Sequence, residues 1–234
     1  MTTKKAVFLD RDHTLIEDPG YISDPTLVKL LPGVGPAVKS LSQAGFKVII
    51  VTNQSGIARG LLTEETLLKI HSEVRRQLAG SGAHLDAIYF CPFHPEGNVE
   101  GYAIDSELRK PRPGMLLKAA KDHNLDLSAS WMVGDSPRDV EAGQRAGCRT
   151  IRLRVQAMQV QGDGQDEDAQ ADFTVRNLVE AAKIILREPD VPPHRPVSMD
   201  FPHPAQPEEL MTDRDILLEI LHSVRQVTDA LKKK

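Results

Sequence analysis

Two carboxylates lie two residues apart near the start of the chain, in the run Asp10-Arg11-Asp12-His13-Thr14. They directly follow a short apolar run, so a buried strand would deliver both acids to one edge of a sheet. Acids at such a place are costly unless a cation or hydrogen bonds hold them. Their types and spacing favour a nucleophile with a second acid, or ligands of a hard cation. A helix cap or a solvated turn is the non-catalytic alternative.

Two further polar segments offer groups that bind phosphate. Residues 52–56 follow the next apolar run and supply a hydroxyl, Thr52, with small polar groups that can donate hydrogen bonds to a phosphate. In residues 109–114, prolines stand beside cationic residues. The prolines hold the backbone extended, which restricts the direction of the Lys110 side chain. Taken alone, the first segment also fits an ordinary turn and the second a basic surface loop.

A fourth segment, residues 134–139, follows another apolar run. Asp135 and Asp139 add oxygen ligands for a hard cation, and Pro137 suits the first turn of a helix. An acid near the helix dipole is the alternative explanation. Together the four segments supply a nucleophile, a second acid, a hydroxyl, a lysine and metal-binding carboxylates. Their order along the chain carries more weight than any one of them.

The apolar runs that must position these side chains alternate with helical patterns. The runs cover residues 6–9, 48–51, 87–90, 131–133, 150–153 and, more weakly, 173–175, and the helical patterns lie near 34–44, 63–80, 114–123 and 137–146. Thr63 is a predicted helix start, and Gly45 and Gly147 are predicted helix ends. This order predicts an α/β fold, a Rossmann-like doubly wound parallel sheet with helices on both faces.

Composition divides the chain into three predicted parts. Residues 1–187 form the α/β domain, residues 188–207 carry seven prolines and are predicted to be a linker, and residues 208–234 return to an amphipathic helical pattern. Within the domain, residues 156–170 are rich in Gln, Asp and Gly, which indicates a surface loop or a partly disordered segment.

The C-terminal segment carries an apolar seam. Leu210, Leu217, Val224 and Leu231 recur every seven residues, although Asp213 interrupts the seam. A helix of this length is marginal alone in water and must bury its stripe. The stripe therefore predicts a homo-oligomer or a helical partner protein, with packing against the chain's own domain as the alternative.

Composition restricts the class of protein and its partners. The net charge is −4 and 40% of the residues are apolar, so we expect a buried core and no nucleic-acid or membrane partner. Only two cysteines occur, Cys91 and Cys148, which favours a reducing compartment. The N-terminal apolar run is too short for a signal peptide, so a cytoplasmic location is expected.

The four segments together resemble the motifs of the haloacid dehalogenase superfamily of phosphatases. The matching positions are Asp10-x-Asp12-x-Thr14, Thr52, Lys110 and Gly134-Asp135-x-x-x-Asp139. Residues 21–23, 31–34, 51–60 and 91–97 are similar to the branch that contains the D-glycero-D-manno-heptose bisphosphate phosphatases and the related histidinol-phosphate phosphatases. The resemblance covers roughly residues 5–187.

The resemblance implies a magnesium-dependent phosphatase that works through a phospho-aspartate. The expected substrate is D-glycero-D-manno-heptose 1,7-bisphosphate, with histidinol phosphate or another small phosphomonoester as the alternative. Asp10 would be the nucleophile and Asp12 the general acid and base, while Thr52 and Lys110 would neutralise the transferring group. Magnesium would be held by Asp10, Asp12 (through its backbone carbonyl), Asp135 and Asp139.

The resemblance also implies which residues bind the rest of a small phosphorylated metabolite. These residues are Asn53, Gln54, Ser55, Arg59 and Arg109. No large insertion follows the first two motifs, so no large cap domain is expected. Loops at residues 17–25, 53–62 and 91–110 are expected to shape the pocket instead.

Two departures from the family pattern affect the expected site. His13 stands where many relatives have glycine, and a neutral loop histidine is favoured over a phosphate contact. Members of this branch often carry a structural zinc in the loop at 91–110, but only Cys91 is kept here. The other three positions hold Phe93, Ser106 and Leu108, which cannot complete a tetrahedral site. Zinc is therefore not expected, with Phe93 and Leu108 packing in its place.

Two interpretations outside enzymology remain open. A phospho-acceptor signalling module of the receiver type also combines acids, a threonine and a lysine on a parallel sheet. Two acids at the first strand end, with a second acidic pair after the fourth strand, favour turnover instead. A scaffold that has lost activity is disfavoured because every expected catalytic residue is present. Multiple turnovers per chain would exclude a stoichiometric acceptor.

Overall fold

The computed structural model describes residues 3–154 and 170–188. The predicted proline-rich linker beyond Glu188 and the predicted C-terminal helix lie outside these described residues, as does nearly all of the predicted loop at 156–170.

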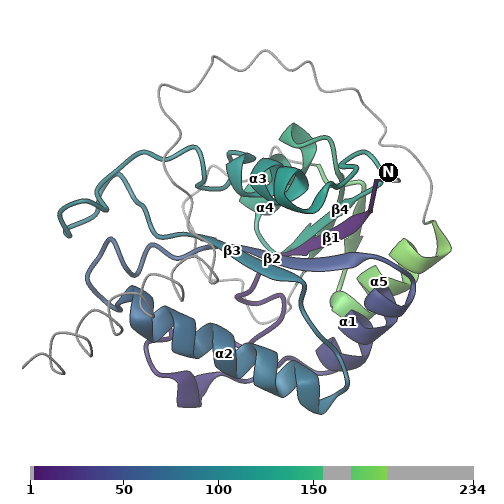
Figure 1. The fold of residues 1–234 in the computed structure, drawn as a ribbon, viewed down its shortest axis with the longest axis horizontal. Coiled ribbons are helices and arrows are strands. Elements are labelled where there is room, and N and C mark those ends of the chain that lie inside the picture. The colour runs from purple at the N-terminus through teal and green to yellow at the C-terminus, as the bar shows by residue number, and fades with distance from the viewer. Residues whose placement is uncertain (1–2, 155–169, 189–234) are drawn as a thin grey trace, which may run out of the picture.

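A six-stranded sheet forms the centre of the described chain, in the order β3-β2-β1-β4-β5-β6 (Figure 1). All five strand pairings are parallel. The strands are β1 (Ala6–Leu9), β2 (Lys47–Asn53), β3 (Ala87–Cys91), β4 (Trp131–Gly134), β5 (Arg149–Leu153) and β6 (Phe173–Val175). Each of the six apolar runs predicted from the sequence is thus a strand.

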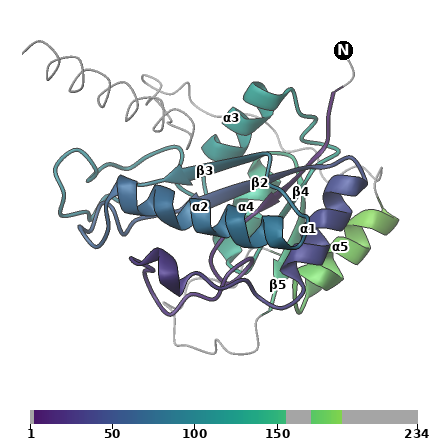
Figure 2. The same cartoon turned by 60° about the horizontal axis from the view of Figure 1, so that its bottom comes forward.

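Helices cover both faces of this sheet, which confirms the doubly wound α/β fold. The helices are η1 (Pro25–Leu27), α1 (Val34–Gln43), α2 (Glu64–Gly80), α3 (Gly114–His123), α4 (Pro137–Arg145) and α5 (Leu178–Arg187). Figures 1 and 2 show α1, α2 and α5 on one face and α3 and α4 on the other. No inserted cap domain interrupts the elements within the described ranges.

Strand β1 shows why both faces must be covered. Its side chains alternate between two apolar cores, because successive residues of a strand point to opposite faces. Val7 and Leu9 pack in the core beneath α1, α2 and α5, whereas Ala6 and Phe8 pack in the core beneath α3 and α4. All four side chains are fully buried, as expected for a central parallel strand.

The strand order places a ligand crevice beside β1. The chain leaves β1 for β2 and β3 on one side and then returns through α3 to β4 on the other side. Ligands of such sheets bind beyond the carboxyl ends of the strands where the order reverses. Asp10 follows β1 and Asp135 follows β4, and the Asp10 backbone N–H donates to the Val133 carbonyl at 3.0 Å. The topology therefore brings these two acids together.

Most predicted helix boundaries are confirmed by the observed caps. The Thr63 side chain accepts from the backbone N–H of Thr66, and α4 begins at Pro137. Gly45 and Gly147 follow helix ends with φ of 86° and 81°, a conformation that only glycine adopts without strain.

Helix α5 was not predicted from the sequence. Its signals are an Asn177 cap that accepts from the Glu180 N–H, and buried apolar residues at helical spacing: Leu178, Ala181, Ala182 and Ile185.

Two further findings bear on the predicted partners and environment. None of the helices within the described ranges is long and apolar enough to cross a membrane. Both cysteines are buried and free of disulfide bonds.

Candidate active site

Three carboxylates meet at the carboxyl edge of the sheet. Asp10, Asp135 and Asp139 each offer an oxygen that lies within 4.8 Å of the other two. They come from the end of β1, the residue after β4 and the first turn of α4. Residues more than 120 positions apart in sequence thus form one acidic centre, as the four sequence segments predicted.

The charge of this acidic centre is only partly balanced. Burial raises the pKa of Asp10 to about 7; the charge of Lys110 opposes this shift, and those of Asp139 and Asp12 add to it. Burial also raises the pKa of Asp135 to about 8, with repulsion from Asp10 and Asp139. A divalent cation would relieve this repulsion, and an all-carboxylate donor set suits Mg²⁺. The residues present therefore fit a magnesium ion.

Lys110 is the cation that the chain itself places in the centre. Its Nζ lies 2.8 Å from Asp10 Oδ1 and 2.5 Å from Asp139 Oδ1, and it donates to the Val51 carbonyl at 2.8 Å. Burial disfavours its charge, yet the two carboxylates outweigh burial and raise the pKa of Lys110. Lys110 therefore stays protonated at neutral pH.

Asn53 fixes the backbone of Lys110. Its Nδ2 donates to the Lys110 carbonyl, its Oδ1 accepts from the Lys110 N–H, and both distances are 3.0 Å. The sequence predicted Asn53 as a substrate ligand, and the structure shows both ends of its amide engaged with the chain. Asn53 thus positions Lys110 across 57 residues of sequence.

Asp139 is held by the start of α4. Its Oδ2 accepts from the Ser136 N–H at 3.0 Å, while the Ser136 side chain caps the helix. A Cβ on Gly134 would lie 2.2 Å from this oxygen, so only glycine permits the approach. Both oxygens of Asp139 already have partners, which leaves Asp10 and Asp135 with more unfilled acceptor positions.

Asp12 lies outside the three-carboxylate group, and the buried guanidinium group of Arg11 binds its carboxylate. Arg11 donates from Nε to Asp12 Oδ1 at 2.8 Å and from Nη2 to Oδ2 at 3.0 Å. Gln54 adds a bond to Oδ2 at 3.0 Å and accepts from Arg11 on its Oε1. Arg11 Nη1 also lies 3.5 Å from His71 Nε2. Neither Arg11 nor His71 was predicted as a site residue. The position of Arg11 between two aspartates in the sequence could have indicated its role.

The other predicted residues of segment 52–56 line a cavity beside Asp12. Thr52 is buried, and its Oγ1 accepts from Gln54 Nε2 at 2.9 Å. Ser55 and Gln54 line a cavity of about 190 Å³, together with Asp12 and Tyr21. The expectation that loops near residues 17–25 and 53–62 shape the pocket is confirmed on this side of the site.

His13 occupies a backbone position that favours glycine. Its φ is 54°, in the left-handed region, and its N–H donates to the Ile16 carbonyl at 2.9 Å. Glycine adopts this conformation without strain, which fits the glycine that the family pattern leads one to expect here. The ring Nε2 lies 3.9 Å from Asp18 Oδ2, so the imidazole meets a carboxylate of the adjoining loop.

The loop at 91–110 is built around apolar side chains. Cys91 and Leu108 are buried in one cluster, and Phe93 packs against that cluster. Ser106 is fully buried, and its Oγ accepts from the Leu108 N–H at 3.1 Å. The predicted packing of Phe93 and Leu108 is confirmed. One thiol, one hydroxyl and two hydrocarbon side chains do not fit tetrahedral zinc.

Purified protein is accordingly expected to contain less than about 0.1 zinc per chain, because three of the four ligand positions offer no thiolate or imidazole. Elemental analysis after dialysis measures the zinc content. A Phe93→His, Ser106→Cys, Leu108→Cys variant, which places a ligand at all three missing positions, tests whether the metal site returns. About one zinc per wild-type chain would show that other ligands complete a site in this loop.

Comparison with known proteins agrees with this geometry. The HAD-hydrolase-like family model matches residues 107–181. A D-glycero-beta-D-manno-heptose-1,7-bisphosphate 7-phosphatase of Yersinia pestis is 42% identical over 180 residues, which cover 77% of this chain and 94% of the relative. The protein of that name from Escherichia coli K12 is 36% identical over 183 residues, covering 78% of this chain and 94% of the relative.

A solved structure shows the same architecture. The D,D-heptose 1,7-bisphosphate phosphatase of B. bronchiseptica, crystallised with magnesium and phosphate, superposes with a TM-score of 0.67 at 34% identity, covering 79% of this chain and 99% of the other. The fold and the acidic edge thus define a haloacid dehalogenase-like hydrolase of the phosphatase class. Within that class, the chain belongs to the D-glycero-D-manno-heptose-1,7-bisphosphate 7-phosphatase family.

Proposed function

We propose that this chain hydrolyses the 7-phosphate of a D-glycero-D-manno-heptose 1,7-bisphosphate with Mg²⁺ as its cofactor. The observation that carries the proposal is the buried group of Asp10, Asp135 and Asp139 with Lys110 Nζ bound to Asp10. The activity named for the Yersinia pestis relative and the magnesium and phosphate in the B. bronchiseptica structure support the substrate and the metal.

The first chemical step uses both acids of the first segment. A carboxylate oxygen of Asp10 attacks phosphorus in line, and the bond between phosphorus and the sugar oxygen breaks. Asp12 gives its proton to that leaving oxygen. Arg11 and Gln54 fix the position of the Asp12 carboxyl beside the cavity.

The second step regenerates the enzyme. The ionised Asp12 takes a proton from water, and the water oxygen attacks phosphorus. The bond between phosphorus and Asp10 breaks, inorganic phosphate leaves, and Asp10 returns as a carboxylate. Asp12 is again protonated for the next turnover.

Neutralising groups surround the transferring phosphoryl. Lys110 supplies a fixed positive charge, and the Thr52 hydroxyl supplies a hydrogen bond in a buried setting where such contacts are strong. Asp10 and Asp135 would hold the metal, with the Asp12 carbonyl and Asp139 beside them. When bound, Mg²⁺ supplies positive charge that offsets the negative charge of the phosphoryl oxygens.

Proton competition gives a prediction for metal binding. Because the pKa values of Asp10 and Asp135 are raised to about 7 and about 8, both groups hold protons at pH 6 and release them near pH 8.5. A carboxyl must ionise to ligate metal, so Mg²⁺ affinity should rise at least about tenfold from pH 6 to pH 8.5. Calorimetric titration of chelator-treated protein with Mg²⁺ at each pH measures this affinity. An affinity that does not change with pH would contradict the raised pKa values.

A substrate panel tests the proposed function. Initial rates with Mg²⁺ are compared for both anomers of the heptose bisphosphate, heptose 7-phosphate, histidinol phosphate and a generic aryl phosphate. We expect kcat/KM for one heptose bisphosphate to exceed that for every monophosphate by at least about 100-fold, because a monophosphate lacks the second charged group that basic residues of the pocket can bind. Preference for histidinol phosphate or equal rates would contradict the proposal.

We further propose a cytoplasmic enzyme whose C-terminal segment, residues 208–234, associates with itself or with another helical protein. The heptad spacing of apolar residues supports this association, and no nucleic-acid or membrane partner is proposed. The segment lies outside the described residues.

Truncation tests the role of this segment. The cut belongs after Glu188, because Glu188 Oε2 lies 2.8 Å from Nη2 of the buried Arg149, which also stacks on Trp131 at 4.0 Å. The truncated chain should keep full phosphatase activity. Its mass by light scattering should be that of a smaller oligomer or a monomer. Equal monomer masses for both chains would contradict self-association.

A further inference from the structure

Arg11 is a buried cation whose guanidinium group contacts three side chains. Only 2% of its side chain is exposed. It donates two hydrogen bonds to the Asp12 carboxylate and one to Gln54 Oε1 at 3.0 Å, and its Nη1 lies 3.5 Å from His71 Nε2. Burying a guanidinium group costs free energy, and an apolar side chain would fill the same space without that loss of solvation. The charge of Arg11 is therefore better explained by the carboxylate that it binds than by packing.

The contacts of Asp12 match the carboxylate that the first chemical step creates. Both of its oxygens accept from N–H groups, Oδ1 from Arg11 and Oδ2 from Arg11 and Gln54. A general acid becomes a carboxylate when its proton passes to the leaving oxygen, and a guanidinium group fixed beside it stabilises the new charge. Arg11 can therefore act on the reaction through Asp12.

His71 supports Arg11 from helix α2. The imidazole is buried, and its ring meets that of Phe90 edge-on, with ring centroids 5.7 Å apart. Because a guanidinium group only donates hydrogen bonds, His71 Nε2 is the acceptor in the contact with Arg11 Nη1. This contact engages the guanidinium nitrogen that binds neither Asp12 nor Gln54. It joins residues 60 positions apart in sequence.

A second contact ties α2 to the segment that follows β1. Gln77 Nε2 donates to the Val28 carbonyl at 2.7 Å, and Gln77 Oε1 accepts from the Leu30 N–H at 3.2 Å. Figure 2 shows η1, which belongs to that segment, beside α2. Helix α2 therefore holds the segment at two places, at Arg11 through His71 and near Leu30 through Gln77. A helix that carries none of the four motifs in this way fixes the position of the general acid.

We propose that Arg11 is a positioning residue for the general acid Asp12, and that His71 of α2 holds Arg11 in place for this task. The inference rests on the proposed function, in which Asp12 protonates the leaving oxygen. The bonds that form and break stay those of the two steps given above. Arg11 and His71 act on how well Asp12 protonates the leaving group and leave the attack of Asp10 on phosphorus unchanged.

Leaving groups of different basicity separate this role from a purely structural one. An alkoxide needs a proton in order to leave, whereas p-nitrophenolate leaves without one. The two substrates are p-nitrophenyl phosphate and the alkyl phosphate that the substrate panel ranks first. The quantity compared is kcat/KM, because it ends at the first irreversible step and excludes the later use of Asp12 as a base. The ratio of the two values does not depend on the fraction of the chain that is folded.

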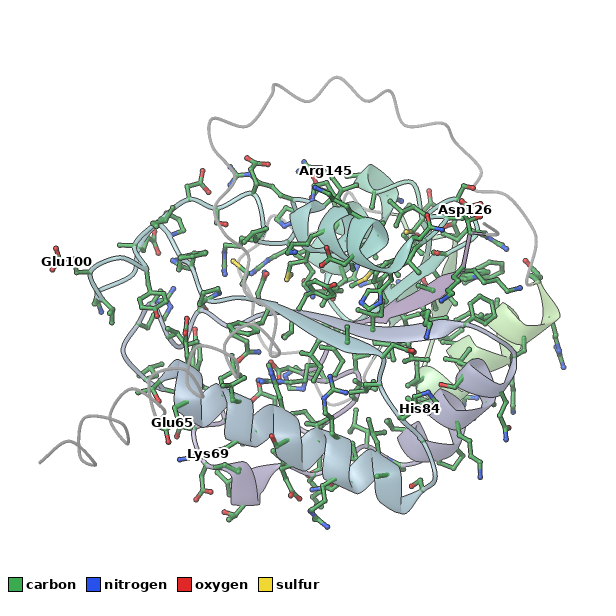
Figure 3. All side chains as sticks on the ribbon, viewed as in Figure 1. Glu65, Lys69, His84, Glu100, Asp126 and Arg145 are labelled. Carbon is green, nitrogen blue, oxygen red and sulfur yellow. The ribbon has the colours of Figure 1, made fainter. Side chains whose placement is uncertain are left out.

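Arg11→Gln should lower kcat/KM at least about 30-fold for the alkyl phosphate and less than about threefold for p-nitrophenyl phosphate. His71→Leu should lower the alkyl phosphate value alone, by about fivefold, the usual size of one hydrogen bond. His71→Gln, which returns an acceptor to the side chain, should recover most of that loss. Asp12→Asn is the reference, with a larger loss of the same selectivity. His84→Leu is the control, because His84 is exposed beyond the end of α2 (Figure 3).

Equal losses for both substrates in Arg11→Gln and His71→Leu would show a structural role and overturn the inference, as would no loss for either. If Arg11→Gln does not fold, the two His71 variants decide by the same ratio. The reference separates this inference from the proposed function. A selective loss in Asp12→Asn without one in the Arg11 and His71 variants contradicts the positioning role alone. If Asp12→Asn lowers both values alike, Asp12 is not the general acid and the proposed mechanism fails as well.

Discussion

Replacing Asp10 by asparagine is expected to lower kcat by at least about 1,000-fold, because the amide cannot attack phosphorus. Asparagine is nearly isosteric with aspartate, and its Oδ1 can still accept the bond from Lys110 Nζ. The pKa of Asp10 is raised to about 7 by burial, so its ionised form destabilises the metal-free fold as pH rises above the unfolded value of about 4. Removing that charge should therefore cost little stability at pH 8.

Steady-state kinetics with saturating Mg²⁺ measure the loss, and urea denaturation checks the fold. Asp126→Asn is the matched control: Asp126 precedes β4 at the opposite end of the sheet and caps its own turn (Figure 3). Its variant should keep turnover within about twofold of the wild-type value. An Asp10→Asn chain that retains more than a few per cent of wild-type kcat would contradict the assignment of the nucleophile.

Lys110→Met should impair both chemistry and stability. Loss of the fixed cation removes stabilisation of the transferring phosphoryl, for which we expect a fall in kcat of at least about 100-fold. In the metal-free protein, Asp10 and Asp139 lose their shared partner, and leaving buried charges unpaired costs about 3 kcal/mol at pH 8. Methionine has a similar length, so packing is largely kept.

The pH dependence of this destabilisation has a definite sign. Without Lys110, the folded-state pKa of Asp10 rises further above its unfolded value. A carboxyl of that kind binds its proton more tightly in the folded state, so stability falls as pH rises toward the folded pKa. Urea midpoints of Lys110→Met should therefore lie nearer the wild-type values at pH 6 than at pH 8. An equal loss at both pH values would show that Lys110 acts by packing alone.

The sequence predicted the elements and the acids well because both depend on local pattern. Apolar runs with helical segments between them define parallel strands, and acids at the ends of β1 and β4 must then meet at one edge. The partners of those acids were harder to foresee. Arg11 and Asp12, which pair with each other, are neighbours in the first motif. Arg11 also contacts Gln54 and His71, which lie 43 and 60 positions away in sequence. Such contacts follow from tertiary placement and leave no periodic signal.

Two residues illustrate the same limit. Asn53 lies in the segment predicted to bind substrate, yet its amide is engaged with the backbone of Lys110. Glu188 fell at the predicted start of the linker, although its carboxylate pairs with the buried Arg149 of β5. Composition marks where prolines begin, whereas the Glu188 contact depends on the tertiary placement of Arg149. Both differences come from contacts between segments far apart in sequence.

The phospho-aspartate intermediate can be tested directly by locating the phosphoryl group on the protein during turnover. Wild-type enzyme mixed with the heptose bisphosphate and Mg²⁺ is quenched in acid, which preserves acyl phosphates, and its peptides are mapped by mass spectrometry. We expect one phosphorylated peptide, with the group on Asp10, and none in the Asp10→Asn chain. Phosphate on another residue during full turnover would contradict Asp10 as the nucleophile.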